Sequence, residues 1–178
     1  MTLDLHEWNE DLSSEESEEY ETLIRVLKIK EGFGLFFVQC NHLQAEKLVA
    51  NIPHFLPQKK IEILCLNKPI HNLYDWVFHT YQIKKFDILL IKGLEHSIHE
   101  YEQSNFNEIT ETKFNLLESV PPILNHLNQQ RERFRDNIPS IFVFLVPPFV
   151  IDYLIYRAPD FFDWRSSLFK LSNSVNPI

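Results

Sequence analysis

Short apolar runs alternate with amphipathic stretches along most of this 178-residue sequence. Five of the runs have the length and the β-branched or aromatic content of buried strands. They occupy residues 35–38, 60–66, 86–91, 140–146 and 167–171. Parallel strands need a long crossover connection, which is usually a helix. The alternation therefore predicts an α/β domain built around a parallel sheet.

The stretches between these runs carry apolar residues at i, i+3, i+4 and i+7, the spacing of helices with one buried face. The predicted helices cover residues 13–30, 45–55, 69–81, 121–134 and 147–156. A capping box of Ser13 and Glu16 starts the first helix, and Pro53 and Pro57 are expected to close the second. Between residues 100 and 119 the periodicity is lost, which predicts a long polar connection.

The segment after the first strand occupies the place of a phosphate-binding loop. In P-loop proteins a buried strand leads into a Gly-rich turn whose backbone N–H groups hold phosphate, followed by a Lys and a Ser or Thr. Here residues 40–46 contain no Gly, and Glu46 places a carboxylate where the pattern requires a cation or hydroxyl. We interpret this segment as a degenerate nucleotide loop, with candidate positions Cys40, Asn41, His42 and Gln44. For the loop alone, an ordinary strand-to-helix turn is the simpler interpretation.

The end of the third strand is the second candidate position. ATPases of this plan hold magnesium with acidic residues there. In this sequence the strand is followed by Lys92, and Glu95 is the nearest acid. A catalytic base without metal or phosphate ligands has nothing to activate. We therefore expect Lys92 and Glu95 to mark a degenerate metal end, with Glu95 a surface or helix-capping acid.

Charge and composition exclude several classes of protein. The net charge is −8, but nine acids precede the first base, Arg25, and the remaining 16 acids face 17 Lys and Arg. This balance argues against a basic nucleic-acid-binding face. No apolar run reaches the ~18 residues of a membrane span, and no secretory signal is present. With two cysteines, Cys40 and Cys65, outside any CxxC motif, a cytoplasmic protein without a disulfide is expected.

Other catalytic and metal chemistry is weakly indicated. A zinc site could use His42, Glu95, His96 and His99. However, with eight histidines scattered through the chain, the i, i+3 pair of His96 and His99 arises easily by chance, so no metal is expected. Arg131, Arg133 and Arg135 could contact phosphate, yet interleaved acids favour a solvated, self-paired face. No triad motif surrounds Ser140 or Cys40.

Five phrases carry a resemblance to a known family: GFGLFFVQCN, LPQKKIEIL, DILLIKGLEHSI, VPPILNHLNQQRERFRDN and FVFLVPPFVIDYLIYRAPDFFDWRS. They resemble the N-terminal domain of a large cyanobacterial group in which a STAND/AAA-like nucleotide-binding domain precedes tetratricopeptide repeats. The resemblance covers roughly residues 22–171, with an acidic lead over 1–21 and a tail over 172–178. It implies a three-layer α/β sandwich with strand order 5-1-4-3-2, and a role in protein-mediated signalling or assembly.

Residues 157–165, RAPDFFDWR, form the last candidate group. In the structural interpretation, these residues form a corner that ties the final strand to the sheet. The functional alternative is a partner-binding surface, since Trp and Arg concentrate binding energy at interfaces. Its candidate residues are Arg157, Phe161, Phe162, Trp164 and Arg165. In active relatives an arginine after the fourth strand senses a neighbouring nucleotide, and the resemblance gives Arg157 that position. If Trp164 is partly exposed, Trp164→Ala is expected to abolish binding of a cellular protein or self-association while leaving the melting temperature nearly unchanged.

Two functions follow from these patterns. The first is a P-loop-like domain that does not hydrolyse nucleotide, uses no cofactor and binds another protein or itself, with no nucleic-acid or membrane partner. The alternative is a STAND-type switch that still binds ATP weakly. The acidic helix over residues 13–30 and the connection over 100–119 are further candidate surfaces, although acidic helices mainly steer encounters.

Overall fold

The structure of the protein, a computed structural model, describes residues 14–106 and 120–171. Five strands alternate with helices along these residues. The strands are β1 (Gly34–Gln39), β2 (Ile61–Cys65), β3 (Ile88–Lys92), β4 (Ile141–Val146) and β5 (Ser167–Lys170). The helices are α2 (Ser14–Ile29), α3 (His42–Phe55), α4 (Leu73–Ile83), α5 (Leu94–Phe106), α7 (Pro122–Asn137), α8 (Pro148–Arg157) and α9 (Pro159–Asp163).

All five strands run parallel in one sheet, in the order β2-β3-β4-β1-β5. Counted from the other edge this is 5-1-4-3-2, so both the parallel α/β sheet and its expected strand order are confirmed. Central β4 is buried at every position because both of its faces are covered, which explains its uninterrupted apolar sequence.

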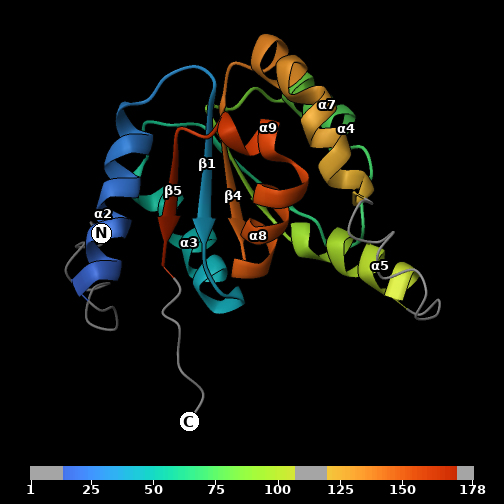
Figure 1. Cartoon of the computed structure of the whole chain (residues 1–178). Helices are drawn as coiled ribbons and strands as arrows, with labels where there is room; N and C mark the ends of the chain where they lie inside the picture. Colours follow the sequence, from blue (N-terminus) through green and yellow to red (C-terminus); the bar gives the residue numbers. More distant parts are fainter. Residues whose placement is uncertain (1–13, 107–119, 172–178) are drawn as a thin grey trace.

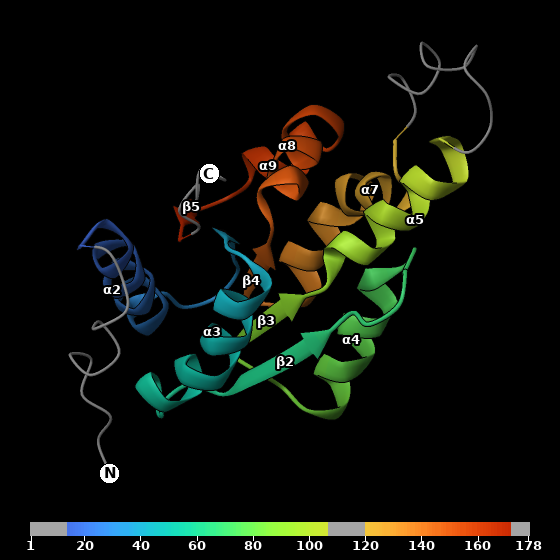
Figure 2. The same ribbon diagram turned by 90° about the horizontal axis from the view of Figure 1, so that it is seen from below.

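Alternate residues of the strands form two separate cores, one on each face of the sheet. Helices α4, α5, α7, α8 and α9 contribute to the first core, where Phe37 stacks on Phe144 with ring centroids 5.4 Å apart. Helices α2 and α3 contribute to the second, around Phe36 and Val143. Figures 1 and 2 show these helices on either side of the sheet. The fold is a three-layer α/β sandwich.

The structure corrects several predicted boundaries. Helix α3 begins at His42, so most of the expected loop over residues 40–46 is helix. Pro53 lies inside α3 rather than ending it, because the amide of Leu56 still donates to the carbonyl of Ile52 at 3.2 Å. The expected connection over residues 100–119 is helical as far as Phe106, and the rest of it lies outside the described residues. The short helix α9 was not predicted.

The outer side of β5 is covered by α2, which lies beside it in Figure 1. The carboxylate of Glu19 accepts a hydrogen bond from the backbone amide of Lys170 at 3.4 Å. Tyr20, just ahead of the expected domain start at residue 22, is fully buried with its ring against Phe55. The acidic helix is therefore part of the packed domain.

In the described part of the chain, none of the helices is both long and apolar enough to cross a membrane.

Candidate functional site

A cavity of about 200 Å³ opens where β1, β3 and β4 end. Ligands of open parallel sheets bind at this carboxyl end, where the strand order reverses. Its lining unites both predicted degenerate positions: Cys40, Asn41 and His42 from the start of α3, and Lys92 and Glu95 from the end of β3. Gln44 is not part of the lining. The structure thus brings residues of both sequence-derived positions together in one cavity lining.

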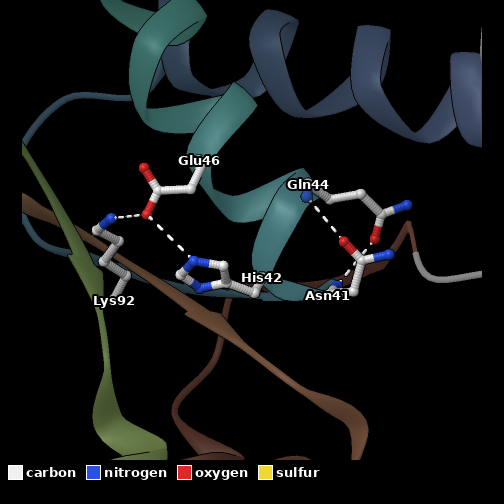
Figure 3. Close-up of polar contacts among 5 residues, drawn as sticks. All are labelled: Asn41, His42, Gln44, Glu46 and Lys92. Atoms are coloured by element: carbon white, nitrogen blue, oxygen red, sulfur yellow. Dashed lines mark hydrogen bonds and ion pairs between the residues drawn. The ribbon is translucent and has the colours of Figure 1, made fainter.

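The connection from β1 to α3 is too short to form a phosphate cradle. Only Cys40 and Asn41 separate the two elements, whereas the P-loop motif G-x-x-x-x-G-K-[ST] requires several residues in the turn. Asn41 and Gln44 form a reciprocal capping box: the Asn41 side chain accepts from the Gln44 amide at 2.8 Å, and the Gln44 side chain accepts from the Asn41 amide at 2.9 Å (Figure 3). Gln44 also donates to the carbonyl of Leu171 at 2.7 Å. The helix start is thus capped by its own side chains.

The charges at Lys92 and Glu46 neutralise each other. The Lys92 ammonium donates to Oε1 of Glu46, and His42 Nε2 lies 3.9 Å from the same oxygen (Figure 3). This hydrogen bond lowers the pKa of Glu46 and raises the pKa of Lys92. The sequence marked both residues as departures from the P-loop pattern but gave no sign that they meet. Their pairing leaves Lys92 poorly placed to attract a phosphate.

Gly93 is one of the residues that line the cavity. Its φ of +95° belongs to the region that favours glycine, and a Cβ atom there would lie 2.4 Å from the carbonyl oxygen of Leu66. The backbones are this close because the Leu66 amide donates to the Lys92 carbonyl at 2.8 Å. Glycine at this position therefore serves strand packing, which needs no bound ligand to explain it.

Cys40 and Glu95 lie close together on the cavity wall. Burial, followed by the nearby charge of Glu95, raises the pKa of the Cys40 thiol to about 12. Since the thiolate is the reactive form, this side chain is a poor nucleophile at neutral pH. Oε2 of Glu95 is buried and has no hydrogen-bond partner among the described residues. Glu95 lies in the first turn of α5, where the helix dipole stabilises a carboxylate.

The three histidines considered for zinc do not all lie in the cavity. His42 and His96 line the cavity with Glu95, but His99 is not in the lining. His99 instead lies 3.8 Å from the Glu102 carboxylate and packs its ring on Phe149. Within residues 14–106 and 120–171, no group of three or more His, Cys, Asp or Glu is arranged to hold a metal ion.

The 157–165 corner lies at the opposite, amino end of the sheet, because α9 leads directly into β5. Phe161 and Phe162 are buried and pack on Phe37, so they belong to the core and cannot form a partner surface. Trp164 is half-buried, and its ring is flanked by the guanidinium groups of Arg131 and Arg135, 5.5 and 5.0 Å from its centroid. The arginines of α7 therefore contact an aromatic ring, in addition to the ion pair of Arg135 with Asp136.

Arg157 and Arg165 retain some exposure at this corner. Arg165 packs its guanidinium 4.2 Å from the ring centroid of Phe162. Arg157 ends α8, which starts beside the cavity and runs away from it for about 15 Å. Arg157 thus follows the fourth strand, as the resemblance implies, and lies at the end of α8 away from the cavity of its own chain. Exposed Ile155 and Tyr156 directly precede it and were missed by the sequence analysis.

Asn67 and Pro147 also line the cavity and were not predicted. Each follows a parallel strand, β2 or β4, shortly after its last residue. The rule that strand ends gather at one end of a parallel sheet is the signal that could have identified them.

Comparison with known proteins gives no match, either to a protein-family model or to a curated protein.

Proposed function

We propose that this domain is a P-loop-like protein that does not hydrolyse nucleotide and works by contact with other proteins, in signalling or assembly. The observation that carries the proposal is the closed connection from β1 to α3. Asn41 and Gln44 satisfy each other there, and the connection has no glycine and no room for a phosphate nest.

Two further features support the proposal. Lys92 is paired with Glu46, so the cavity lacks a free ammonium for phosphate. A volume of about 200 Å³ is below the ~300–1,000 Å³ typical of pockets for drug-sized ligands. The parallel sheet and both cores are nevertheless complete. A fold that keeps its shape without phosphate chemistry is suited to binding other proteins. Kinship with the STAND/AAA-like domains is part of this proposal.

A calorimetric titration with ATP and magnesium tests the proposal. The wild-type protein is expected to give no heat of binding, and the same titration of a P-loop ATPase serves as the positive control. Stoichiometric binding at micromolar nucleotide would overturn the proposal in favour of the ATP-responsive switch. The Glu46→Gln variant, which releases Lys92, shows whether the ion pair contributes to the exclusion of nucleotide.

A further inference from the structure

The outer margin of β2 is the open edge of the sheet. Within the described residues β2 pairs with β3 alone. Leu66 donates its amide to Lys92, and the carbonyl of Lys60 accepts from the amide of Asp87 at 2.7 Å, so even-numbered residues turn their backbone groups toward β3. Because these groups alternate along a parallel strand, Ile61 and Ile63 turn theirs outward. No described residue bonds to the backbone of Ile63 on that side.

Among residues 14–106 and 120–171, nothing gives this edge the protection that edge strands usually have. Short length, charged side chains, proline, bulges or a covering helix normally prevent an edge from pairing with another chain. The single charge within β2 is Glu62, which is neutralised by Lys84 at 2.5 Å. By contrast, β5 at the other edge is covered by α2, with Glu19 bonded to Lys170. The two edges of the sheet are therefore not equivalent.

Exposed apolar side chains flank the open edge. Ile63 is 41 % exposed on the β2 strand itself. On α4, which lies beside β2 in Figure 2, Trp76 is 44 % and Ile83 is 73 % exposed. Tyr74 packs against Phe134 of α7, so Trp76 and Ile83, two turns apart, lie on the other side of α4. The Lys84–Glu62 ion pair places that end of α4 next to β2.

We propose that β2 pairs antiparallel with β2 of a second copy of this chain, about a two-fold axis at Ile63, so that two five-stranded sheets join into one. Edge-strand addition of this kind obtains affinity from backbone hydrogen bonds and specificity from the side chains beside them. The inference names one partner for the interaction domain proposed above, and to that extent rests on the proposed function.

The sequence of β2 is self-complementary in this register. Ile63 lies opposite the partner subunit's Ile63, and Ile61 lies opposite the partner subunit's Cys65, all with outward backbone groups, as hydrogen-bonded pairs require. Glu62 lies opposite the partner subunit's Leu64. A shift that centred the axis on Glu62 would place two carboxylates directly opposite each other, which is destabilising. The charge pattern thus selects the Ile63 register over that one.

Sedimentation velocity over a concentration series tests the inference. The wild-type protein is expected to form a dimer, and Ile63→Lys, which places a charge on the edge, is expected to weaken it at least about tenfold. The matched control is Ile29→Lys, at a 72 % exposed isoleucine on α2, by the protected edge. The control is expected to dimerise like the wild type. A wild-type monomer at every concentration, or equal weakening by both substitutions, would overturn the inference.

A crosslink tests the register even if the lysine variant folds poorly. In a hydrogen-bonded antiparallel pair the Cα atoms are about 5.5 Å apart, within the range that a disulfide spans. Ile63→Cys is therefore expected to give a covalent dimer under mild oxidation, whereas Ile29→Cys is not. Absence of the Ile63→Cys dimer would exclude this pairing. It would leave the proposed function standing, because that function is judged by the ATP titration.

Discussion

The ammonium of Lys92, at the end of β3, bonds to the carboxylate of Glu46 on α3, forty-six residues earlier in the chain. The pair holds the pKa of Glu46 below its ordinary value of 4.5 and that of Lys92 above 10.5. Two residues that depart from the P-loop pattern in opposite senses thus compensate each other. The ion pair links α3 to the end of β3 beside the cavity.

The stability that this pair contributes is expected to depend on pH. The folded-state pKa of Glu46 is depressed, so its contribution is complete above about pH 4.5 and is lost as the pH falls through the folded-state pKa. Glu46→Gln is therefore expected to be less stable than the wild type near neutral pH and to approach it in acid. Urea unfolding of both proteins, near neutral pH and in acid, measures this difference in the free energy of unfolding. The control is Glu132→Gln, an exposed substitution on α7, and an equal effect of that control would contradict the assignment.

No release of phosphate from ATP or GTP is expected above background. The capped start of α3 offers no phosphate nest, and the Lys92–Glu46 pair occupies the metal end. A sensitive phosphate-release assay on the wild type and on Glu46→Gln checks this. Release that disappears in Glu95→Gln would show that Glu95 is a catalytic base and that the expectation is wrong.

The two glycines with positive φ provide a matched pair. At Gly93 an added Cβ would meet the Leu66 carbonyl at 2.4 Å, whereas at Gly32 nothing lies within 4 Å. Gly32→Ala is expected to cost only the backbone strain, about 1–2 kcal/mol. Gly93→Ala adds a backbone clash, so its loss of unfolding free energy is expected to exceed that of Gly32→Ala by at least ~1 kcal/mol. Equal losses in denaturant unfolding would show that the strands relax around the new methyl group.

His126 makes the contact between α4 and α7 sensitive to pH. Its Nε2 accepts the backbone amide of Tyr74 at 3.0 Å, which requires a neutral ring. Burial is the main cause that lowers the pKa of His126; nearby Arg133 lowers it further and Asp75 opposes the shift. Because the folded-state pKa is depressed, this contribution is complete above about pH 6.5 and is lost as the pH falls below that value.

The measurement is the melting temperature between about pH 8 and pH 5. The wild type is expected to lose stability over this range more steeply than His126→Gln, whose amide oxygen can still accept the Tyr74 bond without titrating. His79→Gln, at an exposed position on α4, is the control and is expected to keep the wild-type profile. Identical profiles for all three proteins would remove His126 as the cause.

Trp164→Ala is expected to weaken binding of a protein partner at the 157–165 corner, but not to leave the melting temperature unchanged. The ring packs against the first core and carries two guanidinium contacts, so its loss is expected to cost about 1–3 kcal/mol of unfolding free energy. Tyr156→Ala, at a 77 % exposed aromatic residue of α8, is expected to cost less. Chemical denaturation compares the two. A smaller loss at Trp164 would mean that its ring is not held by these contacts.

The strands could be predicted because buried parallel strands have continuous apolar sequences such as IFVFLV of β4. Their order was an expectation from the family resemblance and does not follow from the apolar runs. The start of α3 could not be placed as well. Its cap depends on Asn41 and Gln44 bonding each other, and the same polar residues are equally compatible with a loop. The end of α5 was missed because its sequence, LEHSIHEYEQSNF, is largely polar with only a narrow buried stripe.

The candidate site was predictable in position but not in chemistry. Cys40 and Lys92 follow strands of a parallel sheet, so their convergence follows from topology. The Lys92–Glu46 ion pair depends on how far two long side chains reach across the cavity, and sequence spacing carries no information about that. Similarly, RAPDFFDWR contains three aromatic residues, and nothing in their order shows that Phe161 and Phe162 enter the core while Trp164 stays half-exposed.

The cover that α2 provides over β5 limits the number of copies that can pair with the sheet. A sheet with two bare edges can add copies without limit and grow into a fibre, whereas a sheet with one bare edge offers a single bond. Here Glu19 bonds to the Lys170 amide on one side, and on the other Ile63 remains available. Two molecules joined across β2 would have α2 at both outer ends, and the assembly would stop at two.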